Sequence, residues 1–173
     1  MARADADQPV TQPLIDRLCD RENDRDRDRS IPISPGSDPY RTRSASVRGL
    51  KAALRRDLEW LLNTRRNPNA APESLAELSQ SLFNYGLPDF SALSVNSPKD
   101  RQFLLIEIER TVALFEPRLR NVRVGLVEGT GTASRSVRFQ IEGSLQMDPS
   151  PEHVSFDGEI QLASGEYQIR GER

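Results

Sequence analysis

The chain has 173 residues, enough for one hydrophobic core of ordinary size but not for two comfortable domains. Its 24 basic and 26 acidic residues leave a net charge of −2, so no positive excess argues for DNA or membrane-surface binding. Cys19 is the only cysteine, which excludes an intrachain disulfide, and no apolar run approaches the roughly 20 residues needed to cross a bilayer. The polar start resembles no signal peptide, so we expect a soluble, cytoplasmic protein.

Residues 1–45 lack a core pattern and are predicted to form a flexible or extended N-terminal arm. Within it, Leu14, Ile15 and Leu18 fall on one side of a short helix near residues 14–18. So short a helix is unstable alone in water, and we therefore expect this apolar triplet to order by docking on a partner. The mixed-charge run that follows is typical of a solvated linker.

The folded part is predicted to be a single α+β domain over residues 46–173. Apolar residues recur every three or four positions from Val47 to Leu61, which predicts an amphipathic helix that begins after Ser46 as N-cap and ends near Asn63.

Two further helices are predicted before the chain changes its period. The first covers residues 73–85, with Leu75, Leu78 and Leu82 among its inward side chains and Gly86 as the left-handed residue after its end. The second begins with a cap, a first-position proline and a first-turn acid in residues 97–100, and it runs to Phe115.

Beyond Pro117 the apolar period changes to two, which predicts strands. Inward positions are expected at Val122, Val124 and Leu126, then over residues 137–141 and 154–162, with a short fourth strand at 167–169. Helices followed by strands predict an α+β fold with the helices packed on one face of a small, mainly antiparallel sheet. We expect an open C-terminal edge near Gln161, and an open edge is either protected or used for pairing.

The tripeptide Glu116-Pro117-Arg118 lies at the corner between the last helix and the first strand. Pro117 stops the helix because it lacks an N–H and disfavours the helical conformation of the residue before it. A rigid corner of this kind fixes where an acidic and a basic group point. Two interpretations stay open, an internal salt bridge that joins helix to sheet and a docking element for another protein.

Four stretches, taken together and in order, resemble one known family. The chain resembles TssE, the baseplate wedge subunit of type VI secretion systems, which is similar to a small wedge protein of contractile-tail phages that was formerly labelled a lysozyme. The matching stretches are Leu14-Ile15-Asp16-Arg17-Leu18, Asp57-Leu58-Glu59-Trp60-Leu61-Leu62-Asn63-Thr64-Arg65, Tyr85-Gly86-Leu87-Pro88-Asp89-Phe90 and Phe115-Glu116-Pro117-Arg118-Leu119.

The resemblance implies a structural role in a contractile injection machine and no cofactor. Glu116, Pro117 and Arg118 match the family's Glu-Pro-Arg motif, which is thought to grip the other wedge subunits, TssF, TssG and TssK. The sheet edge is expected to receive a strand from the sheath subunits TssB and TssC, so that the subunit initiates sheath polymerisation. The implied location is the cytoplasmic side of the inner membrane, at the baseplate that is associated with it.

The alternative is a lysozyme-like peptidoglycan hydrolase, which needs two facing carboxylates about 5–5.5 Å or about 6.5–9.5 Å apart. Glu107 and Glu109 point to different sides of one helix, while Glu109 and Glu116 lie about 10 Å apart along its axis. With one histidine and one cysteine, the chain also lacks a zinc-ligand set. We therefore expect no catalytic residues, no metal site and no enzyme activity.

Overall fold

The computed structural model describes residues 10–11, 13–19, 43–69, 72, 74–90, 92–94, 97–127, 136–161 and 165–172. The chain groups into two compact units, Met1–Leu54 with Met147–Pro149 and Arg55–Gln146 with Ser150–Arg173. Helix α2 (Arg43–Asn63) contributes residues to both. The mixed-charge run at 21–29 lies outside the described residues.

The first unit contains α1 (Leu14–Cys19) and the first half of α2. The short helix expected near 14–18 is present, and the side chains of Leu14, Ile15 and Leu18 are exposed on it. Ser46 is not the N-cap, because α2 begins three residues earlier, at Arg43. The buried Ser46 hydroxyl instead donates to the Arg43 carbonyl (2.8 Å) and accepts from the Val10 N–H (2.8 Å).

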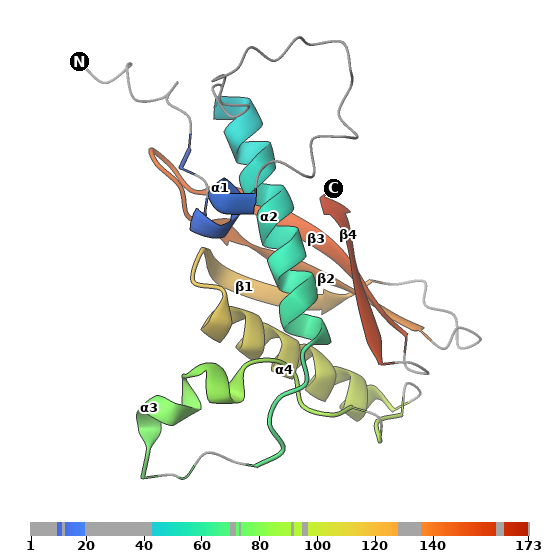
Figure 1. The fold of residues 1–173 in the computed structure, drawn as a ribbon. Coiled ribbons are helices and arrows are strands. Elements are labelled where there is room, and N and C mark those ends of the chain that lie inside the picture. Colours follow the sequence, from blue (N-terminus) through green and yellow to red (C-terminus); the bar gives the residue numbers. More distant parts are fainter. Residues whose placement is uncertain are drawn as a thin grey trace. The chain divides into compact units, whose positions relative to one another are not determined.

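The second unit is built on a four-stranded antiparallel sheet in the order β1-β2-β3-β4 (Figure 1). The strands are β1 (Leu119–Leu126), β2 (Ser136–Leu145), β3 (Glu152–Gln161) and β4 (Glu166–Glu172). Buried side chains alternate along β2 and β3, as the period of two predicted. Gly158 of β3 lies opposite Phe139 of β2, and a Cβ there would be 2.3 Å from the Phe139 ring. The α+β prediction is therefore confirmed.

The expected position of the sheet edge was wrong. Gln161 lies in β3, which pairs with β2 on one side and β4 on the other. The chain turns at Gly165, whose φ of +69° suits glycine, and β4 is longer than the short segment that the sequence predicted. The outer edge on this side of the sheet is therefore β4.

Strand β1 departs from strict alternation. Its register shifts between Arg120 and Arg123, and Asn121 within the shift has a φ of +53°. A bulge of this kind moves the side chains that follow it to other positions. Leu119 and Val122 are buried, whereas Leu126, which we expected to point inward, is exposed.

Helix α4 (Pro98–Phe115) forms as predicted and packs against β1 (Figure 1). The Ser97 hydroxyl accepts from the Asp100 N–H at 3.3 Å, and Pro98 takes the first position. The inward side chains of α4 are Leu104, Ile108 and Val112, and all three are buried.

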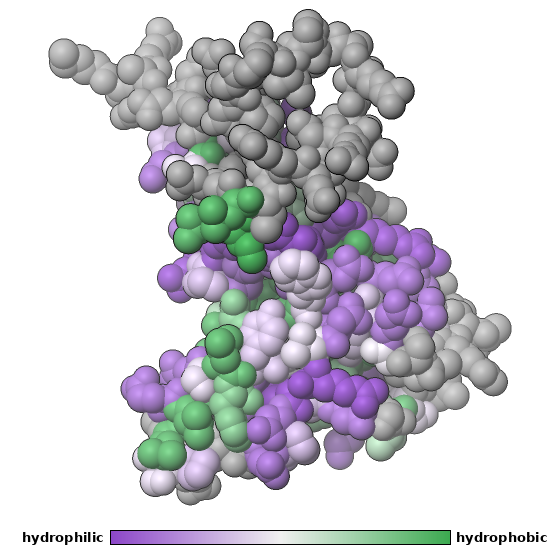
Figure 2. All heavy atoms as spheres, in the orientation of Figure 1, coloured by the Kyte–Doolittle hydropathy of each residue, from purple (hydrophilic) through white to green (hydrophobic). Residues whose placement is uncertain are grey.

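The prediction of one helix over residues 73–85 was wrong in its extent. The structure has two short elements there, α3 (Ala76–Ser79) and η3 (Leu82–Asn84). Ser81 interrupts it: its hydroxyl donates to the Leu78 carbonyl and caps η3 by accepting from the Phe83 N–H. Leu82, expected inward, is 81% exposed. Figure 2 shows a hydrophobic area over α3, η3 and the end of α4. The exposed large hydrophobic residues of this part of the chain are Leu75, Leu82 and Leu114.

Gly86 has the predicted left-handed conformation, with a φ of +99°. Its neighbour Leu87 exchanges backbone hydrogen bonds with Thr64 (2.9 Å) and Arg66 (2.8 Å) in a short bridge between two loops. A Cβ on Gly86 would lie 2.2 Å from the Thr64 carbonyl oxygen, so only glycine fits this approach.

Candidate docking site at the corner between α4 and β1

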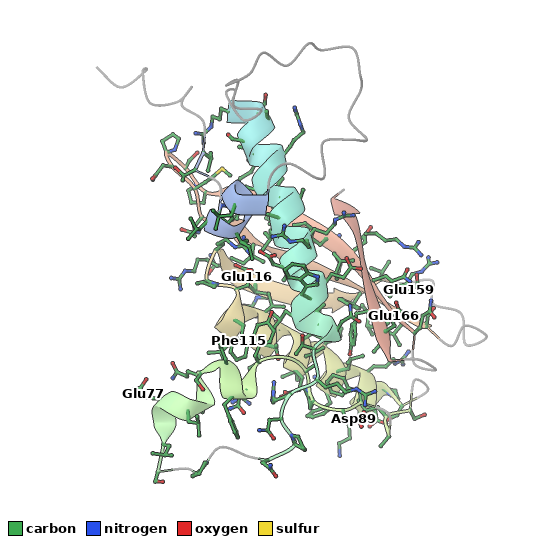
Figure 3. The ribbon with its side chains drawn as sticks, in the orientation of Figure 1. Glu77, Asp89, Phe115, Glu116, Glu159 and Glu166 are labelled. Carbon is green, nitrogen blue, oxygen red and sulfur yellow. The ribbon has the colours of Figure 1, made fainter. Side chains whose placement is uncertain are left out.

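The backbone of the tripeptide connects the helix directly to the sheet. The Glu116 N–H donates to the Val112 carbonyl (2.9 Å), which makes Glu116 the last residue bonded to α4. Two residues later, the Arg118 carbonyl accepts from the Gln146 N–H (2.8 Å), just beyond the end of β2. Figure 3 labels Phe115 and Glu116 where α4 ends and the chain enters β1. The corner is therefore fixed at both ends by backbone bonds.

The side chains of the corner form an ion cluster with α2. The Arg118 guanidinium donates from Nε to Glu116 Oε1 (2.6 Å) and from Nη2 to Glu116 Oε2 (2.5 Å). The same Nη2 donates to Asp57 Oδ2 at 2.7 Å. Such a two-point contact between guanidinium and carboxylate is directional as well as strong. The cluster, defined here as Asp57, Glu116 and Arg118, ties α2, α4 and β1 together.

The internal salt bridge that the sequence left open is therefore present. Only 7% of the Glu116 side chain is exposed, compared with 25% for Arg118. Burial disfavours the charge of Arg118, but hydrogen bonds and attraction from Glu116, and then from Asp57, outweigh it and raise the pKa of Arg118 above its usual range. The guanidinium is therefore charged at physiological pH.

Tyr85 lies in the electrostatic field of the same cluster. Burial, and then the negative charges of Asp57 and Glu116, raise the pKa of the Tyr85 hydroxyl above its usual value. Its ring packs edge-on against Phe115, with centroids 5.3 Å apart. The Tyr85 stretch and the corner, which are distant in sequence and both belong to the resemblance, thus meet in space.

The cluster does not use every donor of Arg118. Across the described ranges of the chain, Nη1 of Arg118 makes no hydrogen bond, and part of its side chain is exposed. Arg56 donates twice to Asp57 Oδ1 (3.1 and 2.9 Å) and lies 4.9 Å from the ring centre of Trp60. Trp60 is 55% exposed.

The sequence identified Glu116 and Arg118 but not the α2 residues that join them. Asp57 and Trp60 were visible only as part of a stretch shared with the family, and no spacing rule connects Asp57 to a residue 61 positions later. The other predicted binding residues, Leu14, Ile15 and Leu18, belong to α1 in the other compact unit.

A hollow of about 420 Å³ lies between residues 79–84 and the C-terminal half of α4. Arg66 and Arg110 line it. Arg66 is held by Glu107 (3.5 Å), by the Thr111 hydroxyl (3.1 Å) and by the Gly86 carbonyl (3.2 Å). The guanidinium of Arg66 is therefore bonded within the protein and helps to hold the loop at Gly86 against α4.

The acids considered for catalysis have structural partners. Glu107 pairs with Arg66 and Arg110, while Glu109 accepts from the Val124 N–H (3.1 Å) and lies 3.8 Å from Arg123. Among the described residues, no three His, Cys, Asp or Glu side chains are grouped so that they could hold a metal ion. A search of the same residues found no helix with the length and apolar character of a membrane span.

Comparison with known proteins gives the family. A family model described as baseplate wedge protein gp25 matches residues 48–150, more than half of the chain. The match contains the α2 end, the Tyr85 stretch and the whole corner. No curated protein and no solved structure matched the chain in two further comparisons. The chain therefore belongs to the gp25 family of baseplate wedge proteins, as its resemblance to TssE implied.

Proposed function

We propose that the chain is the structural wedge subunit of a contractile type VI secretion machine, which links the wedge complex to the sheath and initiates sheath polymerisation. Membership of the baseplate wedge family supports the structural part of this proposal. The type VI assignment rests on the four TssE-like stretches, three of which meet around the cluster of Asp57, Glu116 and Arg118.

The wedge contact is proposed for the exposed side of that cluster. The observation that carries it is the geometry of Arg118: two carboxylates orient the guanidinium, and Nη1 is left available for an acceptor on the partner. A preorientated arginine loses less side-chain entropy on binding than a free one. The exposed indole of Trp60, beside Arg56, adds the kind of aromatic anchor that is common in interfaces. The proposed partners are the wedge subunits TssF, TssG and TssK.

The sheath contact is proposed for the outer edge of β4. An edge strand presents backbone N–H and C=O groups to which an extended segment of another chain can bond. Addition of a strand from TssB or TssC would start the sheath there. The exposed Leu14, Ile15 and Leu18 of α1, in the arm predicted at 1–45, would dock on a further baseplate component. The assembly site would be the cytoplasmic baseplate at the inner membrane.

Deletion of the gene and complementation test the proposal. Cells that make the chain and carry a fluorescent sheath subunit should lose sheaths on deletion and regain them when the wild-type chain is supplied. The hydrolase alternative makes the opposite prediction, namely normal sheaths after deletion and a fall in turbidity when purified chain is added to peptidoglycan. Observation of that second pattern would overturn the structural assignment.

A further inference from the structure

The outer edge of β4 is already bonded to a side chain from the end of α2. Asn63 Oδ1 accepts from the Tyr167 N–H (2.9 Å), and Asn63 Nδ2 donates to the Tyr167 carbonyl (2.8 Å). A residue of a neighbouring antiparallel strand forms the same pair of bonds, one accepted and one donated. The carboxamide of Asn63 therefore acts on β4 as a single peptide group of an added strand would.

The register of the sheet confirms that these bonds face outward. Tyr167 lies opposite Ile160 of β3, yet its N–H and C=O bond to Asn63. Because backbone groups alternate in direction along a strand, the next residue whose N–H and C=O point away from β3 is Ile169. An incoming strand that uses Ile169 would meet Asn63 at its next bonding position.

Asn63 is held at the surface. Its Nδ2 also donates to the Glu59 carbonyl (2.8 Å) in the last turn of α2, so both amide hydrogens and the oxygen are used. The residue itself is exposed, which means that water or another backbone can replace its bonds without opening the core.

The opposite edge is covered in a different way. There α4 packs against β1, and Glu109 accepts from the Val124 N–H (3.1 Å). An ionised carboxylate can accept but cannot donate, whereas the Asn63 amide does both. The β4 edge is thus the one covered by a peptide-like group.

We propose that Asn63 is a displaceable cover of the β4 edge, which prevents unwanted strand pairing in the free subunit and yields its two bonds to the incoming strand. This inference rests on the proposed strand addition by a sheath subunit. Proteins commonly protect edge strands against pairing with the wrong chain, and a cover made of one exposed side chain can be removed at small cost. The backbone of the new strand replaces both hydrogen bonds, so little is lost in the exchange.

Two readouts on the full chain test the cover. In Asn63→Ala, amide hydrogen exchange at Tyr167 should rise about tenfold, since one backbone hydrogen bond is lost. Exchange at Gln168, which faces β3, should stay unchanged. Thr64→Ala is the matched control, because Thr64 Oγ1 bonds the Trp60 carbonyl (2.7 Å) at the same helix end and, among the described residues, makes no hydrogen bond to β4. In cells with a fluorescent sheath subunit, Asn63→Ala should form at least as many sheaths as wild type.

The outcomes separate the cover from the proposed function. Unchanged hydrogen exchange at Tyr167 in Asn63→Ala would overturn the proposed cover. Fewer sheaths from a folded Asn63→Ala protein than from Thr64→Ala would also overturn it, because Asn63 would then be a fixed clamp on β4. If Asn63→Ala fails to fold, Asn63→Asp, which keeps the acceptor for Tyr167 but loses the donor, serves in its place and should also preserve sheath number. If exchange at Tyr167 rises in Asn63→Ala but deletion of the chain leaves sheaths intact, the cover of the β4 edge stands and only the proposed role in sheath initiation is rejected.

Discussion

At the scale of single residues, Arg118 joins the corner to α2 and is also the residue that we propose to bind the wedge. Its Nε and Nη2 are used by Glu116 and Asp57, while Nη1 stays available. Because Glu116 is buried and both of its carboxylate oxygens are bonded to Arg118, the pair contributes to stability. Of the two interpretations that the sequence left open, the internal salt bridge is the one that the burial of Glu116 supports.

We therefore expect Glu116→Gln to lower the free energy of unfolding by about 1.5–3 kcal/mol, the range for hydrogen bonds to charged groups. Glu159→Gln is the matched control: Glu159 pairs with Arg170 at 2.9 Å, but that arginine is largely exposed, so a loss of at most about 1 kcal/mol is expected. Urea denaturation followed by circular dichroism measures both. Equal losses in the two variants would mean that burial adds nothing to the corner pair.

Tyr167 carries a second prediction at this scale. Its hydroxyl is buried and, within the described part of the chain, has no hydrogen-bond partner, while its ring packs edge-on against Phe139 at 6.3 Å. Removing an unpaired buried hydroxyl while keeping the ring removes a desolvation penalty. Tyr167→Phe should therefore raise the free energy of unfolding at pH 7 by about 1–3 kcal/mol. Unfolding by urea measures this, and a destabilised variant would reveal a bond to the hydroxyl.

The same residue gives a pH dependence. Burial raises the pKa of the Tyr167 hydroxyl above its usual value of about 10, so the unfolded chain releases this proton first as the pH rises. The free energy of unfolding that depends on this protonated hydroxyl is complete below about pH 10 and is lost progressively above it. Wild type should lose stability between neutral pH and about pH 10.5 more steeply than Tyr167→Phe. A residual slope is expected from Tyr85, whose pKa is raised in the same direction. Identical slopes in the two proteins would contradict the assignment to Tyr167.

At the scale of elements, the outer edge of β4 can be tested with a proline. The Ile169 N–H points away from β3, so Ile169→Pro removes an outward donor but no bond within the sheet. Ile169→Ala is the control, because it loses a similar part of the buried side chain and keeps the N–H. We expect both variants to be destabilised to a similar degree, while only the proline variant fails to form sheaths. Imaging of a fluorescent sheath subunit decides the matter, and equal sheath numbers would argue against strand addition at this edge.

The sequence predicted best those elements whose local signals agreed with their packing. Helix α4 has a cap, a first-position proline and a regular apolar face, and each appears as expected. The 73–85 segment has a helical apolar period, but the Ser81 hydroxyl bonds the backbone and stops the helix. In β1, the bulge at Asn121 changes which side chains point toward the core. An apolar period of two in the sequence cannot reveal such an inserted residue.

The functional site was predictable only in part, for a related reason. Glu116 and Arg118 are neighbours in sequence, and Pro117 fixes their relation. Asp57 reaches them through the tertiary packing of α2, and Asn63 reaches Tyr167 across 104 positions. Contacts of this range depend on the whole fold, so composition and period carry no signal for them.

At the scale of the whole molecule, the two proposed contacts lie on separate parts of one chain. The corner cluster would bind the wedge, and the β4 edge would bind the sheath. The family match covers the corner and extends to residue 150, just before β3. Separate contacts imply that variants at one part should leave the other working.

The most direct test is quantitative mass spectrometry of what a tagged chain captures from cells that assemble the machine, using wild type, Arg118→Lys and Ile169→Pro. Lysine keeps the charge but lacks the planar guanidinium, whose Nε and Nη2 bond the two carboxylates while Nη1 stays available, so Arg118→Lys should lose the wedge subunits. Arg120→Ala, an exposed arginine two residues further along the chain, is its control and should capture them normally. Ile169→Pro should retain the wedge subunits and lose only the sheath subunits. Capture of the same proteins by all four chains, or of no baseplate protein by wild type, would contradict the account.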